Sequence, residues 1–67
     1  MIDARGRSCP EPVVMIKKAM ISNEDNYEIV VDSKVSVENI TRFVQHNGYQ
    51  AEVVENDSDY VLKIKRK

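Results

Sequence analysis

The thiol of Cys9 is the side chain of this sequence best suited to nucleophilic chemistry. It stands in the motif Cys9-Pro10-Glu11-Pro12, in a turn just before a predicted helix. A helix N-terminus carries roughly half a positive charge, which stabilises a thiolate and lowers its pKa. Arg7, two residues earlier, adds a further positive charge. A lone cysteine is most often a small buried hydrophobe, but this position is a poor place for burial. The sequence therefore indicates a reactive thiol.

The two prolines of the motif limit the hydrogen bonds that the start of the helix can offer. Pro10 suits the first helical position, because its missing N–H would be unpaired there anyway. Since Pro10 and Pro12 have no N–H, only the Cys9 and Glu11 amides remain as donors in the first turn. We predict that the prolines, with Gly6 in the preceding turn, hold the sulfur outward while Glu11 points to solvent. The alternative is that the prolines only stiffen the start of the helix.

The sequence supplies no obvious second group for catalysis at this thiol. A dithiol redox cycle needs a second cysteine, and the chain has one. A cysteine hydrolase needs a base, usually histidine, and the only histidine, His46, is predicted on a solvated helix face. A carrier role remains: Cys9 accepts a sulfane sulfur from a donor persulfide, holds it, and releases it to another protein's thiol. This exchange needs no metal and no cofactor.

Length and composition narrow the class of protein further. A chain of 67 residues is enough for one domain, residues 1–67. Ten basic residues against eleven acidic ones argue against direct nucleic-acid binding, which needs a strongly basic face. So short a chain without disulfides points to the cytoplasm. Charges throughout residues 1–20 argue against a signal peptide, and the longest apolar run, residues 13–16, is far too short to span a membrane.

Apolar periodicity predicts six elements in the order β-α-β-α-β-β. The strands lie at about residues 1–5, 27–32, 49–55 and 60–65, and the helices at about 10–21 and 36–47. Ser36 is the predicted N-cap of the second helix, Val35 and Ile40 would form a hydrophobic staple, and Gly48 ends that helix. We therefore expect an α+β fold: a two-layer α/β sandwich with a four-stranded mixed sheet and two helices on one face.

The segment Asp3-Ala4-Arg5-Gly6-Arg7-Ser8-Cys9-Pro10-Glu11-Pro12, followed by Val13 and Lys17-Lys18, resembles the TusA/SirA/YedF family of small sulfur carriers. The element order also matches that family's two-layer sandwich, so the resemblance covers essentially the whole chain. It implies that Cys9 carries a persulfide. It also implies a cysteine desulfurase or other persulfide donor, and a sulfur-relay protein as acceptor. Family members serve tRNA thiolation and related sulfur trafficking, or selenium metabolism.

Two departures from the family pattern bear on the pathway. Arg7 replaces the apolar residue that usually follows the glycine. Residues 37–43, with Asp32 before them and Asn47-Gly48-Tyr49 after them, look closer to the YedF-like branch than to the tRNA-relay branch. The carrier chemistry is common to both branches.

A carrier must dock on a donor and an acceptor in turn. The basic residues nearest the motif are the candidate docking residues: Arg5, Arg7, Lys17 and Lys18. For the two lysines, a solvated helix face is the competing interpretation. Two other functions stay open. One is a redox- or selenium-linked regulatory or binding module that uses Cys9, and the other is an interaction domain that uses the polar sheet face.

Overall fold

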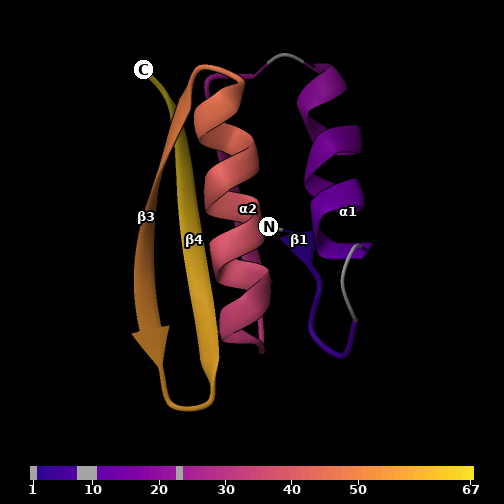
Figure 1. Ribbon diagram of the computed structural model, residues 1–67, viewed down its shortest axis with the longest axis vertical. Helices are drawn as coiled ribbons and strands as arrows, with labels where there is room; N and C mark the ends of the chain where they lie inside the picture. The colour runs from indigo at the N-terminus through magenta and orange to yellow at the C-terminus, as the bar shows by residue number, and fades with distance from the viewer. Residues whose placement is uncertain (1, 8–10, 23) are drawn as a thin grey trace.

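The computed structural model describes residues 2–7, 11–22 and 24–67. Its elements follow the predicted order (Figure 1), with a short 3₁₀ turn, η1, after the first helix. Their bounds are β1 Ile2–Asp3, α1 Glu11–Ala19, η1 Met20–Ser22, β2 Asn26–Val31, α2 Lys34–His46, β3 Tyr49–Asn56 and β4 Asp59–Arg66.

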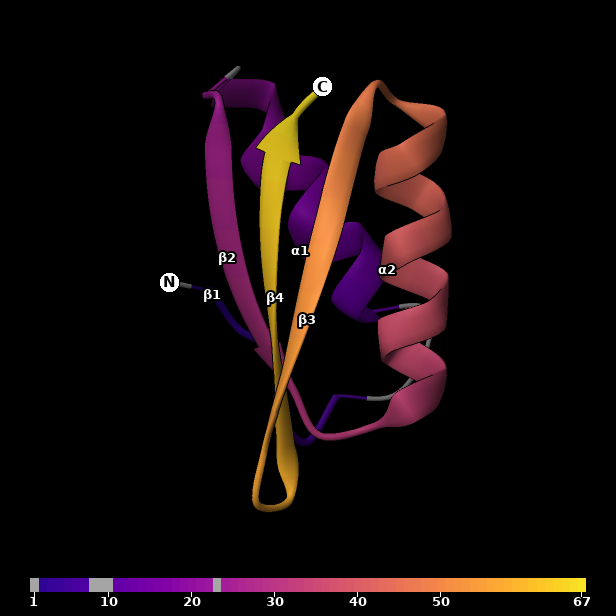
Figure 2. The same cartoon turned by 90° about the vertical axis from the view of Figure 1, so that its left-hand side faces the viewer.

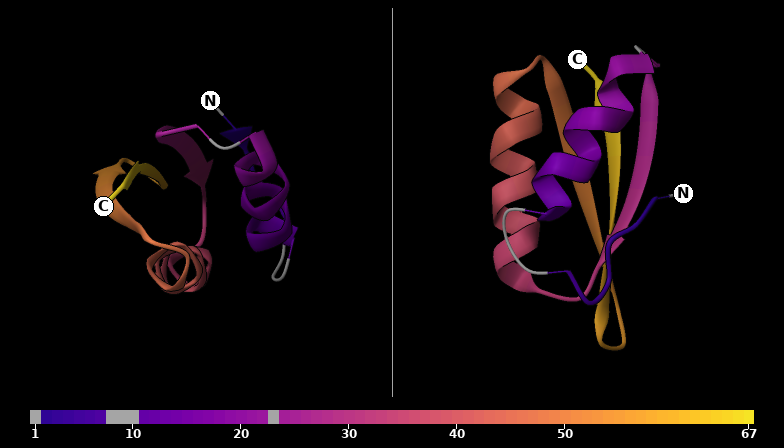
Figure 3. Two further views of the ribbon diagram at one scale, coloured as in Figure 1. Left: turned by 90° about the horizontal axis from the view of Figure 1, so that it is seen from above. Right: turned by 90° about the vertical axis from the view of Figure 1, so that its right-hand side faces the viewer.

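The four strands form one mixed sheet in the order β1-β2-β4-β3. β1 runs parallel to β2, whereas β2 and β3 both run antiparallel to β4. Figure 2 shows β2, β4 and β3 side by side with α1 behind them. Seen from above, both helices lie on the same side of the curved sheet (Figure 3, left). The predicted two-layer α+β sandwich is therefore confirmed.

Alternation along the strands determines which face of the sheet is buried. In β2, Tyr27, Ile29 and Val31 are buried toward the helices, where Leu62 and Ile64 of β4 join them. The helices contribute Ile16, Ile40 and Val44 to the same core. Burying an aliphatic side chain of this size contributes about 1.5–3 kcal/mol. The other face carries charged residues in register across the strands, among them Glu28, Lys63 and Glu52.

The predicted start of α2 is wrong. Ser33, and not Ser36, is the N-cap residue, and it makes no side-chain cap hydrogen bond. Ser36 lies inside the helix and is 4% exposed. Val35 is 57% exposed and therefore cannot form the predicted staple with Ile40. The N-cap therefore lies three residues earlier than expected. An additional N-terminal turn keeps Ile40 and Val44 on the buried face, so the apolar stripe alone does not determine where the helix begins.

The start of α2 lies toward the end of the molecule that holds the tip of the β3–β4 hairpin, whereas α1 begins nearer the middle of its length (Figure 1). The hairpin is tight: Asn56 pairs with Asp59 across a two-residue turn. Asp57 in this turn adopts a positive φ of 49°, a conformation that aspartate tolerates better than most residues. The turn after β1 is joined to this end of the molecule, because Arg5 binds Asp59 of the hairpin.

Candidate functional site

The structure describes the residues on either side of the candidate nucleophile, but not the nucleophile itself. Ser8, Cys9 and Pro10 lie outside the described residues, and the description resumes at Glu11. The residues before and after this segment are anchored to the rest of the fold. The contacts of Gly6, Arg7, Glu11 and Pro12 therefore define the two points between which the motif segment runs.

Gly6 is anchored from outside its own loop. Its N–H donates a hydrogen bond of 2.8 Å to Oδ2 of Asp32, which lies between β2 and α2. Gly6 has a φ of +76°, which glycine adopts without the steric penalty that a Cβ brings. The N–H of Arg7 donates to the carbonyl of Ala4 at 3.3 Å. The chain thus reverses direction at a defined point two to three residues before Cys9.

Arg7 and Glu11 form an ion pair that joins the two sides of the motif. Nη1 of Arg7 lies 3.2 Å from Oε2 of Glu11, and both side chains are more than half exposed. An exposed pair of this kind contributes about 0–1 kcal/mol to stability. Its electrostatic consequence matters more, because the carboxylate of Glu11 offsets the positive charge that Arg7 was predicted to add beside the thiol. Glu11 is exposed as predicted, and its carboxylate is paired with Arg7.

Pro12 has a structural role that the sequence did not reveal. Its side chain is fully buried with the largest core residues, and it belongs to the first turn of α1. Ile16, one turn later, is also fully buried. The start of α1 is therefore held down by packing as well as by the rigidity of proline. The prediction that the prolines keep the sulfur outward stays a prediction, and Pro10 lies outside the described residues.

Arg5 binds two carboxylates on the sheet face opposite the helices. Its guanidinium lies 3.0 Å from Asp3 and 3.3 Å from Asp59 of the hairpin. Hydrogen bonds from the Arg5 side chain, then from its amide, lower the pKa of Asp3 to about 2. The same side-chain bonds raise the pKa of Arg5. Because β2 separates β1 from β4, the Arg5 side chain spans the end of β2.

Comparison with known proteins decides the family. The family model described as "Sulfurtransferase TusA" matches residues 1–66. The chain belongs to the TusA family. The resemblance inferred from the motif and the element order is therefore confirmed over essentially the whole length. The likeness to the YedF-like branch stays a prediction.

Two similar proteins agree with this assignment. A SirA-like protein from Desulfitobacterium hafniense, of known crystal structure, superposes with a TM-score of 0.87 at 34% identity. That match covers 96% of this chain and 92% of the other. A candidate sulfur carrier protein from Methanocaldococcus jannaschii is 37% identical over 97% of this chain and 91% of its own length.

The remaining candidate docking residues of this TusA-family chain lie farther from the motif. Lys17 and Lys18 are exposed in the last turn of α1. Lys18 lies seven positions after Glu11, which is about 10 Å along a helix axis. The structure therefore brings Arg7 and Glu11 together beside the motif, places Arg5 on the open sheet face, and leaves the two lysines at the other end of α1.

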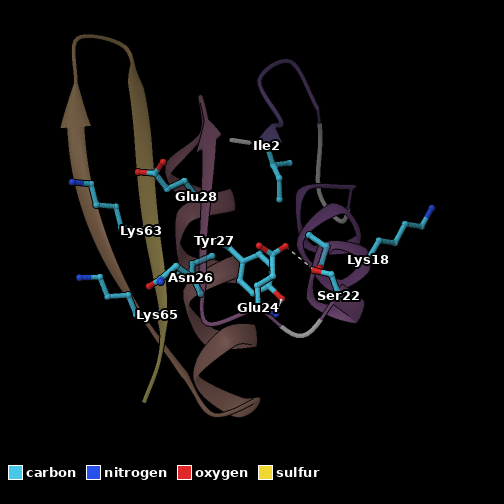
Figure 4. Close-up of a pocket in the computed structure, with 11 residues that line it drawn as sticks. Ile2, Lys18, Ser22, Glu24, Asn26, Tyr27, Glu28, Lys63 and Lys65 are labelled. Carbon is cyan, nitrogen blue, oxygen red and sulfur yellow. Dashed lines mark hydrogen bonds between the residues drawn. The ribbon is translucent and has the colours of Figure 1, made fainter.

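A groove of about 620 Å³ lies beside Lys18, between the end of α1 and the sheet. Figure 4 shows Lys18 and Ser22 on its helix side, with Lys63 and Lys65 on its strand side. Its lining also includes Ile2, Ala19 and Tyr27. The groove is far from the start of α1, so it does not enclose the motif. None of the described residues that flank the motif, Gly6, Arg7, Glu11 and Pro12, lines this groove.

Other classes of site find little support in the described part of the chain. Over residues 2–7, 11–22 and 24–67, no three histidine, cysteine, aspartate or glutamate side chains gather as a metal site. His46 is exposed at the end of α2, as predicted. Within the same residues, no helix has the length and apolar character needed to cross a membrane.

Sequence reasoning missed the residues that hold the motif loop from a distance. Asp32 binds Gly6 from 26 positions away, and Asp59 binds Arg5 from 54 positions away. A single sequence carries no periodic signal for such pairs. The available hint was the position of Asp32 directly after a buried strand and before a helix, where polar side chains commonly bind nearby backbone.

Proposed function

We propose that this TusA-family chain is a sulfur carrier that holds a sulfane sulfur on Cys9 as a persulfide. Family membership over residues 1–66 carries the proposal, since the matched region includes the Cys-Pro-Glu-Pro motif. The relative named as a candidate sulfur carrier supports it. Anchoring of Gly6 and the Arg7–Glu11 pair, on either side of the motif, also fits a loop that presents one thiol to successive partners.

The proposed transfer is two thiol exchanges in sequence. The Cys9 thiolate attacks the outer sulfur of a donor persulfide, such as that of a cysteine desulfurase. A new S–S bond forms on Cys9, and the donor cysteine leaves as a thiolate that takes up a proton. An acceptor thiolate then attacks the outer sulfur on Cys9, and Cys9 departs as a thiolate. The sulfur is relayed without net oxidation or reduction.

Docking would use basic residues on three parts of the surface: beside the motif, on the open sheet face and at the far end of α1. Arg5, Arg7, Lys17 and Lys18 stay the proposed partner-binding residues, but their charges are not equivalent. Arg5 and Arg7 are already paired with carboxylates, whereas Lys17 and Lys18 are exposed. The acceptor would be a sulfur-relay protein in tRNA thiolation or related sulfur trafficking.

Intact-mass measurement tests the proposal. The reduced protein is incubated with a cysteine desulfurase and cysteine, without added thiol, next to a Cys9→Ala control. We expect the native protein alone to gain the mass of one sulfur, and a reductant to reverse the gain. No gain with several desulfurases would contradict the carrier role and favour a redox- or selenium-linked regulatory thiol.

A further inference from the structure

Asp32 occupies a rigid position between two elements of the sandwich. It follows Val31, the last residue of β2, which is fully buried and in register with Tyr60 of β4. Two residues later, α2 begins at Lys34. Asp32 itself is exposed, so its carboxylate is not needed to fill the core. Its backbone is nonetheless fixed from both sides.

The carboxylate of Asp32 transfers this rigidity to the motif loop. Its Oδ2 accepts the Gly6 N–H at 2.8 Å, and a hydrogen bond to an ionised acceptor is stronger than one between neutral groups. Two residues before Gly6, the chain is also attached to β2, because the Ala4 N–H donates to the Val30 carbonyl at 2.9 Å. Asp32 extends this attachment from Ala4 to Gly6, three residues beyond the end of β1 at Asp3.

Cys9 lies three residues after Gly6, so no more than about 10 Å of extended chain separates their Cα atoms. On the other side, the buried Pro12 holds the start of α1. Fixing Gly6 therefore restricts where the sulfur can lie relative to the helix start. Transfer between thiols is sensitive to such restriction, since a misplacement of about 1 Å can cost on the order of 100-fold in rate.

We propose that Asp32 is a positioning residue for sulfur transfer, acting through its hydrogen bond to the Gly6 amide. This inference rests on the proposed carrier function of Cys9. Asp32 does not touch the reacting atoms in this account. It holds the loop so that the Cys9 thiolate stays near the start of α1, where the helix dipole stabilises it.

Two substitutions separate geometry from charge. Asp32→Asn keeps a side-chain oxygen that can accept the Gly6 N–H but removes the negative charge, whereas Asp32→Ala removes both. Asp25→Ala is the matched control, because that carboxylate also makes an exposed contact, to Arg66 at 2.9 Å, and lies in the loop at the other end of α1. Each variant is measured for thermal unfolding, for transfer of sulfur from loaded protein to a thiol acceptor, and for the pH profile of Cys9 alkylation.

We expect Asp32→Ala to slow transfer by about 10-fold and to raise the apparent pKa of the Cys9 thiol. Asp32→Asn should retain transfer within about twofold and should not raise that pKa. Asp25→Ala should transfer at the native rate. A lower melting temperature in Asp32→Ala with native transfer per folded molecule would overturn the proposal, because the role would then be structural only. Equal losses in Asp32→Asn and Asp32→Ala would overturn it too, because charge would then explain the effect.

Failure of the carrier function would be recognised separately. If the native protein gains no sulfur from any donor, the proposed function fails. The role of Asp32 is still decided by the alkylation profile and by hydrogen exchange at Gly6. Faster Gly6 exchange together with a raised thiol pKa in Asp32→Ala alone would support positioning, and native values for both in that variant would refute it.

Discussion

Among the described carboxylates, Asp3 is the one whose pKa folding lowers most clearly. Its Oδ1 accepts the Arg5 amide and Nε, each at 3.1 Å, and its Oδ2 accepts Nη2 of Arg5 at 3.0 Å. These bonds favour the carboxylate and lower the Asp3 pKa from 3.8 to about 2. The consequence is a dependence of stability on pH that a variant can isolate.

The sign follows from linkage between proton binding and folding. Above about pH 4, Asp3 is ionised in both the folded and the unfolded chain, and its stabilisation is fully present. As the pH falls from about 4 to about 2, the unfolded chain takes up the proton first, so stability is lost. Asp3→Asn should flatten this part of the profile of urea midpoint against pH. Arg5→Gln should flatten it as well, and an unchanged fall in both variants would show that other carboxylates cause it.

At the scale of an element, α1 is anchored at its start by a buried proline. Pro12 and Ile16 are both fully buried, whereas Glu11 between the motif cysteine and Pro12 is 57% exposed at its side chain. Ile16 is spaced three and four positions from the apolar residues Val13 and Met20, a pattern that predicts burial on one helix face. The sequence interpretation assigned Pro12 to the chemistry of the motif, because proline at a helix start has a sufficient local explanation.

We expect Pro12→Ala to lower the free energy of unfolding by about 1–3 kcal/mol. Removal of the proline ring leaves unfilled space in the core, and the unfolded chain gains backbone freedom when proline is replaced. Glu11→Ala, one position earlier, should change stability by no more than about 1 kcal/mol, since it removes only an exposed ion pair. Urea unfolding of both variants checks this. Similar losses in the two would show that burial of Pro12 contributes little. Native sulfur loading in a destabilised Pro12→Ala would assign Pro12 to packing alone.

At the scale of the whole molecule, the sequence predicts features that rest on a repeating pattern of side chains. It does not predict contacts that occur once between distant positions. Alternation in β2 and the stripe through Ile40 and Val44 recur along an element, so the sandwich and its core follow from pattern. The contacts of Asp32 with Gly6 and of Asp59 with Arg5 each occur once and join distant positions. Such contacts emerge only when the fold brings the ends of β2, β4 and the motif loop together.

The end of the molecule opposite the hairpin tip is closed by a second set of single contacts (Figure 1). The Glu24 N–H donates to Oη of Tyr27 at 2.8 Å, and Oη of Tyr49 donates to the Glu24 carbonyl at 3.1 Å. Arg66 binds Asp25 at 2.9 Å and lies 5.2 Å from the centre of the Tyr49 ring. Tyr49 therefore links the start of β3 to the loop before β2 and to the end of β4.

Tyr49→Phe tests whether the two ends of the molecule act independently. The variant keeps the buried ring but loses the hydroxyl that binds Glu24, so stability should fall by about 0.5–1.5 kcal/mol. Hydrogen exchange should accelerate in the loop around Glu24 and Asp25. Sulfur transfer from Cys9 should stay at the native rate, because α1 separates this loop from the motif. A slower transfer in folded Tyr49→Phe would mean that the sandwich couples its two ends. Transfer that depends on Asp32 but not on Tyr49 would confine the functional requirement to the end where Asp32 binds Gly6.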